Sequence, residues 1–430
     1  MLSPKTLSLP LPLRFCLAAI CLSSVHCSKQ EAAKQEPAPG IAAVEKPAEP
    51  AEPAEPKTPG VSDTEVVIGV TNPLSGPAAG WGVPITGGMQ AWVSEINEKG
   101  GIHGRKLKLI IKDDGYNPAR ALSNLQEMKD RVLAIAGQLG SAPSAACKDF
   151  YPENKIPLIH GYANVDIYAK QPKEKQKYYF IAYPDYENES EYFGKYAVEE
   201  LKAKKIAHFY QNDDYGMGAN AGIKKALAAL EGKAELVAEV PYEATERAVN
   251  THALKLKESK ADTVIITTMM SAAALITKEM VKIDYRPTMV GSFTLGDPIM
   301  FAIAGEAWEG TYVSVPGHIG TPGADPAADK VSAILNGRNE KLKGKEMLAL
   351  FGAATIMHLA EGMKNAGKEL TRESLIAGME KIENFQPEGM GAPVTYSAER
   401  HHGVNAVRPC QAKDKKLNPL GDHVVFAPKF

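Results

Sequence analysis

Short apolar runs rich in β-branched residues alternate with segments of helical periodicity along most of the chain. Apolar residues that recur every three or four positions predict helices, and they cover 87–97, 119–131, 189–201, 218–230, 248–258 and 272–283. The short runs predict strands over 66–70, 107–111, 132–136, 156–159, 205–210, 236–240, 263–267, 288–291 and 310–315. Continuous apolar strands that alternate with helices are typical of parallel sheets covered on both faces. The predicted fold class is therefore α/β.

The predicted strands are too numerous for one economical sheet, so we expect two Rossmann-like lobes with parallel sheets. The chain would leave the first lobe near Tyr183-Pro184-Asp185 and return to it near Val315-Pro316-Gly317. A third crossing over 396–404 would carry the last strands to the second lobe. Three crossings form a hinge, and ligands of open α/β sheets bind beyond the carboxyl ends of the strands. We therefore expect the binding site in the cleft between the lobes.

The first residues have the pattern of a secretory signal peptide, over 1–27. Lys5 and Arg14 are positively charged, and the apolar run 15–22 is too short to span a bilayer. Two interpretations of Cys27 stay open, because it either precedes the cleavage site or is the lipid-modified first residue of the exported protein. His26 departs from the small residue that is usual before a lipid-modified Cys. Both interpretations predict a periplasmic or other extracytoplasmic location.

A segment rich in Ala, Glu and Pro follows over 28–62 and contains a threefold repeat at 48–56. Such a composition predicts an extended, semi-rigid spacer. A spacer fits a membrane tether at Cys27, and the alternative is a disordered leader with no role. Beyond the spacer we assign 63–184 and 316–400 to the first lobe and 185–315 and 401–430 to the second.

Charge and motifs exclude several classes of function. The chain has 49 Lys and Arg and 51 Asp and Glu, a formal charge of −2, and the two signs are interspersed, which argues against nucleic-acid binding. No segment after the signal peptide is apolar for long enough to cross a membrane. The sequence contains no Gly-x-Ser-x-Gly elbow, Walker loop or His-Glu-x-x-His motif. We therefore expect neither an enzyme nor a cofactor.

The most informative segment is 68–77, where an apolar strand breaks into a Pro/Gly/Ser loop that leads to Trp81-Gly82 and a helix. Such a strand-to-helix loop offers free backbone N–H groups and one aromatic face to a small ligand. The turn at 100–107 and the pair Asp113-Asp114 follow. This block resembles the start of periplasmic solute-binding proteins of the branched-chain amino-acid type. The resemblance implies a type I periplasmic binding protein that passes a small-molecule ligand to an inner-membrane ABC permease.

The resemblance also implies particular ligand contacts. Ser141, in the loop after the strand that ends at Ala136, matches the Ser that holds the ligand carboxylate at a helix start, and the alternative is an ordinary N-cap. Asn164 stands where the family has a hydroxyl residue, with Tyr162 as a wall beside it. The remaining matches are two aromatic residues of the cleft, Tyr215 in the turn 212–218 and Trp81.

Two departures from the family pattern bear on the ligand. Phe293 occupies the position where binders of α-amino acids place an acidic residue, and Met269 stands where Tyr or a small polar residue is common. An ammonium buried without a partner costs several kcal/mol. We therefore expect a carboxylate with an apolar or aromatic body and no amino group. Phe293 and Met269 could instead be plain core residues.

Alternatives remain for the ligand and for the role. A shift in register would bring Asp297 into the cleft and favour a branched-chain or related amino acid. A ligand sensor that feeds a receptor or regulator would have the same fold.

Several other residues carry simpler interpretations. The family layout places Cys147 and Cys410 in different lobes, so a disulfide would block the hinge and we expect free thiols. His401 and His402 are adjacent and without spaced partners, which argues against a metal. Asp113-Asp114 is expected to cap the helix that starts near Pro118.

Overall fold

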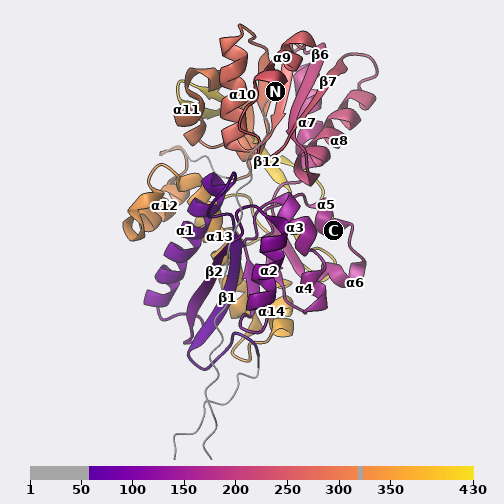
Figure 1. The fold of residues 1–430 in the computed structure, drawn as a ribbon. Helices are drawn as coiled ribbons and strands as arrows, with labels where there is room; N and C mark the ends of the chain where they lie inside the picture. Colours follow the sequence, from indigo (N-terminus) through magenta and orange to yellow (C-terminus); the bar gives the residue numbers. More distant parts are fainter. Residues whose placement is uncertain (1–57, 318–322) are drawn as a thin grey trace, which may run out of the picture. The chain divides into compact units, whose positions relative to one another are not determined.

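The computed structural model describes residues 58–317 and 323–430, which form two α/β lobes (Figure 1). The predicted signal peptide, most of the spacer and Cys27 lie outside the described residues. Within the described part of the chain, no helix has the length and apolar character needed to cross a membrane. The α/β fold class with two lobes is confirmed.

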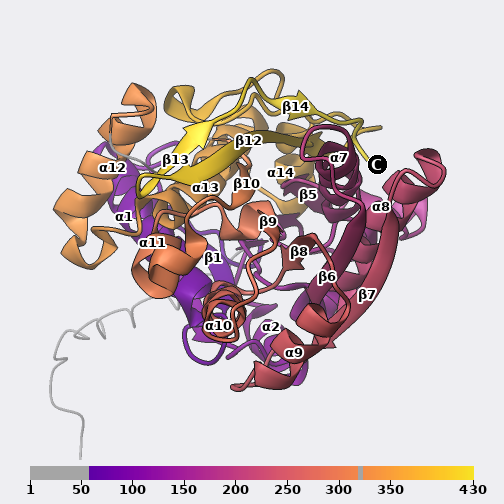
Figure 2. The ribbon, with the colours of Figure 1, turned by 90° about the horizontal axis from the view of Figure 1, so that it is seen from above.

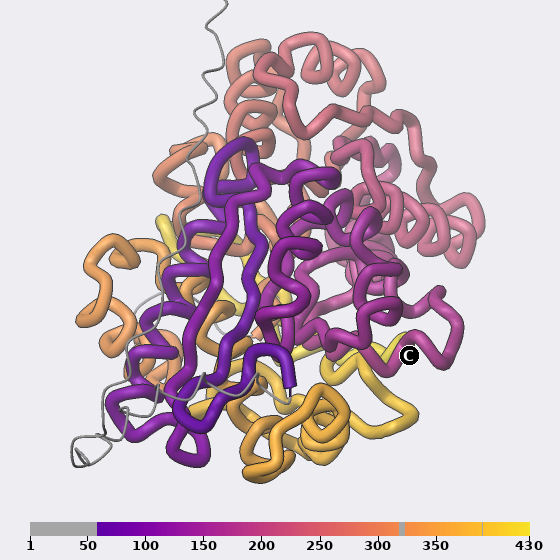
Figure 3. The backbone as a smooth tube through the Cα atoms, turned by 60° about the horizontal axis from the view of Figure 1, so that its bottom comes forward, coloured from indigo at the N-terminus to yellow at the C-terminus, as the bar shows by residue number. Residues whose placement is uncertain are grey.

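The first lobe is built on a 6-stranded parallel sheet with the strand order β11-β5-β4-β3-β1-β2. Figure 3 shows β1 and β2, both indigo, beside one another. The strands of this sheet are β1 (Glu65–Asn72), β2 (Lys106–Asp113), β3 (Ala134–Ala136), β4 (Leu158–Ile159), β5 (Tyr179–Ala182) and β11 (His402–Val404). The helices of this lobe are α1 (Ala79–Glu98), α2 (Pro118–Met128), α3 (Ser141–Cys147), α4 (Phe150–Glu153), α5 (Asp166–Ala169), α6 (Lys173–Gln176), α12 (Pro326–Arg338), α13 (Glu346–Ala366) and α14 (Arg372–Met379), with 3-10 turns at Glu340–Leu342 and Pro387–Gly389.

The second lobe is built on an 8-stranded mixed sheet with the order β13-β12-β10-β9-β8-β6-β7, and β14 also pairs with β12. The C-terminal strands β12, β13 and β14 run antiparallel to their neighbours and lie along one edge (Figure 2). The strands are β6 (Lys205–Gln211), β7 (Glu235–Tyr242), β8 (Thr263–Thr267), β9 (Thr288–Gly291), β10 (Tyr312–Val315), β12 (Ala406–Lys413), β13 (Lys416–Pro419) and β14 (Val424–Val425). The helices are α7 (Tyr186–Glu199), α8 (Asp214–Ala229), α9 (Asn250–Glu258), α10 (Met270–Lys282) and α11 (Ile299–Ala304), with 3-10 turns η1 (Phe293–Leu295) and η2 (Gly305–Trp308).

Three connections join the two sheets. The first is Tyr183-Pro184-Asp185, between β5 and α7, where Asp185 caps the helix by accepting the N–H of Asn188. The second leaves β10 through Pro316-Gly317. The third is Asn405, between β11 and β12. This crossing was expected over 396–404, but the last three of those residues form β11, which belongs to the first sheet. The three hinge connections therefore lie side by side at the ends of neighbouring strands.

Helix α1 packs closely against α13 in the first lobe (Figure 1). The helices touch backbone to backbone, because a Cβ on Gly88 would lie 1.9 Å from the carbonyl oxygen of Ala349. A Cβ on Gly352 would meet the carbonyl of Ile85 at the same distance, 1.9 Å. Only glycine permits this approach at either position.

Several local predictions need correction. Helix α1 begins at Ala79, earlier than expected, so Trp81 lies in its first turn and not in the preceding loop. Helix α2 does begin at Pro118, but its cap is Asn117, whose side chain accepts the N–H of Arg120. Asp113 instead accepts the backbone N–H groups of Leu74, Ser75 and Gly115 and so holds the loop that follows β1.

The cysteine prediction is confirmed. Cys147, at the end of α3, and Cys410, in β12, are both buried free thiols, and burial raises the pKa of each to about 11.

The adjacent His401 and His402 each form a hydrogen bond with another group of the protein. His401 Nε2 lies 3.1 Å from Glu380 Oε1, and His402 Nε2 donates to the carbonyl of Tyr183.

Candidate ligand-binding cleft

A cavity of about 50 Å³ lies between the lobes, at the carboxyl ends of the parallel strands. Open α/β sheets bind ligands at this edge. Loops after β1, β2, β3 and β4 line it from the first lobe, and residues after β6, β8 and β9 line it from the second. The lining residues are Ala78, Trp81, Tyr116, Leu139, Gly140, Ser141, Tyr162, Tyr183, Tyr186, Gln211, Tyr215, Thr268, Met269 and Thr294.

None of the residues that line this cavity has a formally charged side chain. Six of the 14 lining residues are aromatic, a tryptophan and five tyrosines that come from both lobes. Tyr186 and Tyr215 pack ring against ring with centroids 4.3 Å apart, and Tyr162 and Tyr183 meet edge to face at 5.6 Å. Such a wall offers ring faces and edges against which an apolar or aromatic ligand body can pack.

The hydroxyl of Ser141 is the polar group best placed for a ligand. Its Oγ accepts the backbone N–H of Asn164 at 3.0 Å, which leaves the hydroxyl proton available for donation. By contrast, the hydroxyls of the neighbouring tyrosines are already paired with the protein. Tyr162 donates to the carbonyl of Phe351 at 2.9 Å, and Tyr215 bonds to the hydroxyl of Thr294 at 2.5 Å. These tyrosines therefore present mainly their rings to the cavity.

Hydrogen bonds cross the cleft and join the lobes. The Nδ2 of Asn164 donates to the carbonyl of Asp214, 2.6 Å away, at the start of α8. The hydroxyl of Tyr116 donates to Asp213 at 3.1 Å and accepts from Gln211 at 2.9 Å. Because both pairs connect residues of different lobes, the structure is a closed form of the cleft.

A larger, mostly apolar groove of about 440 Å³ lies beside the cavity. The two spaces share the lining residues Ala78, Trp81 and Met269, so they are adjacent. The groove runs along α10 and α11, and Lys278 is one of its lining residues. Its other lining residues are Pro77, Gly80, Met270, Ser271, Ala274, Leu275, Ile299 and Ile303.

Comparison with known proteins agrees with this geometry. The family model described as a periplasmic binding protein matches residues 65–416 of the chain. The chain belongs to this family. As a periplasmic binding protein it has an extracytoplasmic location, and its relatives are solute-binding proteins, not enzymes.

Among curated relatives of this binding protein is the Leu/Ile/Val-binding protein homolog 1 of Brucella abortus (strain 2308). It is 27% identical over 322 residues, which are 74% of this chain and 83% of the relative. Solved structures with the same fold include a fatty acid ABC transporter substrate-binding protein from Thermomonospora curvata, with a TM-score of 0.76, 23% identity and coverage of 86% and 94% of the two chains. A leucine-binding protein from Thermotoga maritima has a TM-score of 0.72, 20% identity and coverage of 84% and 98%. The two-lobed type I fold of the branched-chain amino-acid family is thereby confirmed.

Within the cleft of this periplasmic binding protein, five of the residues predicted to face the ligand come together. The lining of the cavity includes Trp81, Ser141, Tyr162, Tyr215 and Met269. Each follows a strand at its carboxyl end or begins the next helix, as the strand pattern predicted.

The two other predicted contacts lie elsewhere. The side chain of Asn164 is occupied by the bridge to Asp214 and by the N–H of Asp166, which it accepts at 3.0 Å. Phe293 is fully buried one layer behind the cavity wall, stacked on Tyr186 with centroids 5.4 Å apart. Neither Asn164 nor Phe293 is among the residues that line the described cavity. In this closed form, neither side chain is placed to touch a ligand in the cavity.

Two buried carboxylates near the cleft were not among the predicted site residues. Glu189, on α7, accepts hydrogen bonds from Ser292, the N–H of Phe293 and Ser314, and burial raises its pKa to about 7. Asp213 caps α8 and bonds to Tyr116 and Gln211, which both line the cavity; burial raises its pKa too.

Asp297 was the alternative partner for a ligand ammonium. Its Oδ1 accepts the N–H of Ile299 at 2.7 Å, its side chain is buried, and burial raises its pKa to about 6. It does not line the described cavity.

Proposed function

We propose that this protein binds a carboxylate with an apolar or aromatic body and no amino group, and delivers it to an inner-membrane ABC permease. The observation that carries this proposal is the lining of the cleft, which has no formally charged side chain and is rich in aromatic residues. An amino acid would bring an ammonium into this site, where no lining carboxylate could pair with it. A buried charge without a partner costs several kcal/mol, more than one apolar contact returns.

A carboxylate is easier to accommodate than an ammonium in this lining. Hydroxyl and amide donors can stabilise an anion without a full positive charge, and hydrogen bonds to a charged acceptor are the stronger kind. The Ser141 hydroxyl has a proton to donate, because its oxygen already accepts the N–H of Asn164. We therefore place the carboxylate at Ser141 and the apolar body against Trp81, Tyr215 and Met269.

Delivery to a permease requires that the bound form differ from the free form. The bridges from Asn164 to Asp214 and from Tyr116 to Asp213 join the lobes only when the cleft is closed. A ligand held by both lobes would favour that closed form, and the permease would recognise it. The name of one structural neighbour, a fatty acid ABC transporter substrate-binding protein, agrees with such a role.

A branched-chain amino acid is the second candidate ligand, favoured by the names of the Leu/Ile/Val-binding relatives. For that ligand an ammonium partner must appear when the lobes rearrange. Asp213 is the residue to consider, since opening the cleft would release its carboxylate from Tyr116.

Matched ligand pairs separate the two candidates. Thermal unfolding and calorimetry of the purified full-length protein would compare leucine with 4-methylpentanoate, and phenylalanine with 3-phenylpropionate. Within each pair only the amino group differs. A ligand present at about 100 times its Kd stabilises the folded state by about 2.7 kcal/mol, which raises the Tm by several degrees.

We expect stabilisation by the amine-free acids alone, with weaker binding to Ser141→Ala. Stabilisation by leucine or phenylalanine alone would refute the proposal. In that case, loss of the effect in Asp213→Asn would identify the ammonium partner.

A further inference from the structure

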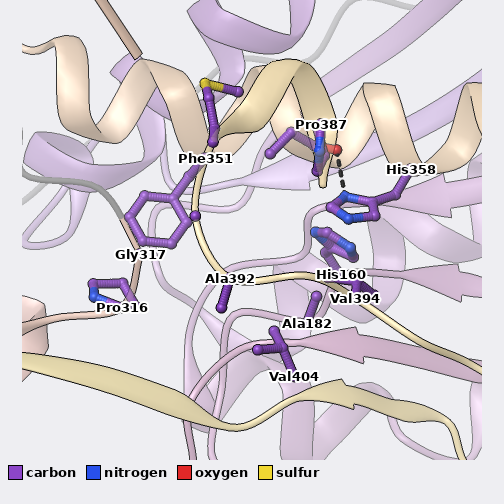
Figure 4. Close-up of a pocket in the computed structure, with 13 residues that line it drawn as sticks. His160, Ala182, Pro316, Gly317, Phe351, His358, Pro387, Ala392, Val394 and Val404 are labelled. Atoms are coloured by element: carbon purple, nitrogen blue, oxygen red, sulfur yellow. Dashed lines mark hydrogen bonds between the residues drawn. The ribbon is translucent and has the colours of Figure 1, made fainter. Parts of the chain in front are cut away.

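A second cavity lies in the first lobe, away from the cleft, and contains a pair of buried histidines (Figure 4). It has a volume of about 70 Å³, and its lining shares no residue with that of the cleft. All three hinge connections contribute to or adjoin its wall, through Ala182, Pro316-Gly317 and Val404. The remaining lining residues are His160, Phe351, Ala354, His358, Pro387, Met390, Gly391, Ala392 and Val394.

His160 and His358 pack against each other at one side of this cavity, with ring centroids 4.6 Å apart (Figure 4). Each of the two residues is only 3% exposed. The Nε2 atoms of both rings are buried and have no hydrogen-bond partner among the described residues. Buried polar atoms are nearly always paired, so two such atoms beside one cavity indicate that something else satisfies them.

The hydrogen bonds at Nδ1 decide what the two Nε2 atoms can do. His358 Nδ1 lies 2.7 Å from the carbonyl of Ala354, which can only accept, so Nδ1 carries the proton and Nε2 is an acceptor. His160 Nδ1 lies 3.2 Å from the hydroxyl of Thr355, which can donate or accept. His160 Nε2 can therefore adopt either role. Burial lowers the pKa of His358 to about 4 and that of His160 well below its usual value, so both rings are neutral.

The cavity thus offers one fixed acceptor, one adjustable nitrogen and an otherwise apolar wall. A hydroxyl group is complementary to this pair, since it can donate to His358 and accept from His160. A charged ligand would have no counter-charge among the lining residues. A metal ion would be left with two imidazoles, and the described residues hold no group of three or more His, Cys, Asp or Glu side chains suited to a metal.

We propose that this cavity is a second binding site, for a small uncharged molecule with an apolar body and a hydroxyl group, such as a phenol or an alcohol. Water is the competing occupant, because a cavity needs only about 10–15 Å³ to hold one molecule. The test must therefore distinguish an organic ligand from a group of waters.

Phenol and its methyl ether, anisole, are suitable probes because anisole lacks the hydroxyl proton. The ring nitrogen resonances of His160 and His358 would be followed in ¹⁵N-labelled full-length protein, and assigned with His358→Phe. We expect phenol to shift both sets of resonances in a saturable manner, and anisole to do so at least tenfold more weakly.

Two variants make the result specific to this cavity. Ala392→Leu fills the space without changing a cleft residue, and His358→Phe removes the fixed acceptor. Both should abolish the phenol response, while binding of the cleft ligand persists. The proposal is overturned if phenol causes no saturable shift, if the shift persists in Ala392→Leu, or if Zn²⁺ shifts the resonances and phenol does not.

Discussion

The side chain of Asn164 donates a hydrogen bond to the backbone carbonyl of Asp214, 2.6 Å away, and so connects the first lobe to the first residue of α8 in the second. A Cβ on Gly218 would lie 2.5 Å from the Nδ2 of Asn164, so the facing helix has a glycine where this amide approaches. The residue was expected to hold the ligand directly. Its position instead makes it a contact between the lobes, present only when the cleft is closed.

We therefore predict that Asn164→Ala weakens ligand binding without removing a ligand contact. Loss of one intramolecular hydrogen bond costs about 1 kcal/mol, equivalent to roughly fivefold in Kd. Calorimetry would measure the affinity, and small-angle scattering the fraction of open protein. Asn154→Ala is the matched control, because Asn154 donates to Phe150 within its own lobe. Equal effects of the two variants would contradict the role in closure.

The buried carboxyl of Glu189 predicts a pH dependence of stability. Its pKa rises from 4.5 to about 7 in the folded protein, because the side chain is removed from water. Between these values the folded protein holds a proton that the unfolded chain releases, so this group lowers the free energy of unfolding as the pH rises through that window. We expect Glu189→Gln to be more stable relative to the native protein at pH 8 than at pH 5.

The size of the Glu189 effect is at most a few kcal/mol, from about 1.4 kcal/mol for each unit of pKa. Urea unfolding at the two pH values would measure it. Glu200→Gln, an exposed change at the end of the same helix, is the control and should show no such trend. A Glu189→Gln variant with the same pH profile as the native protein would show that this carboxyl is ionised throughout.

The contact between α1 and α13 predicts a contrast between two glycines of one helix. A Cβ on Gly88 would collide with the carbonyl oxygen of Ala349 at 1.9 Å, whereas a Cβ on Gly80 meets no atom within 4 Å. Gly88→Ala should lower the free energy of unfolding by about 1–3 kcal/mol, as overpacking does. Gly80→Ala should be neutral or stabilising by up to about 1 kcal/mol, because alanine favours helix. Similar values from urea unfolding of both variants would mean that the helices can separate at little cost.

The cleft was largely predictable from the sequence because its positions follow from the ends of strands. Once β1, β3 and β6 are recognised as buried apolar runs, Tyr215 must lie at the carboxyl edge of the second sheet and Ser141 at that of the first. Trp81 reaches that edge although helix α1 begins earlier than expected, since the added turn still starts beside β1.

The orientation of individual side chains could not be predicted in this way. Phe293 is the first residue of the 3-10 turn η1. Its ring stacks on Tyr186 and does not point into the cavity. Glu189 is held by Ser292 and Ser314, which are more than a hundred residues away in sequence. Asn164 turns to Asp214 only because the lobes close. Each of these depends on contacts between distant segments that no local pattern records.

The apolar groove beside the cleft predicts a preference for longer ligands. Its wall contains Leu275, which is 41% exposed on α10, and the groove shares the lining residues Trp81 and Met269 with the cavity. An alkyl tail that extends from the cavity into the groove would gain about 0.8 kcal/mol of binding free energy for each buried methylene. This gain lowers the Kd roughly fourfold for each added carbon. A series of straight-chain carboxylates should therefore bind more tightly with length until the groove is full.

Leu275→Lys would place a charge in the groove and should reduce that gain, while the affinity for the shortest acids stays unchanged. Leu254→Lys is the matched control, because Leu254 is similarly exposed, at 47%, on α9 and does not line the groove. Calorimetry across the chain-length series measures the slope of binding free energy against carbon number for each variant. If the native protein shows no dependence on length, the groove does not hold the ligand. If Leu254→Lys flattens the slope as much as Leu275→Lys, the effect comes from added charge alone and the groove is not the cause.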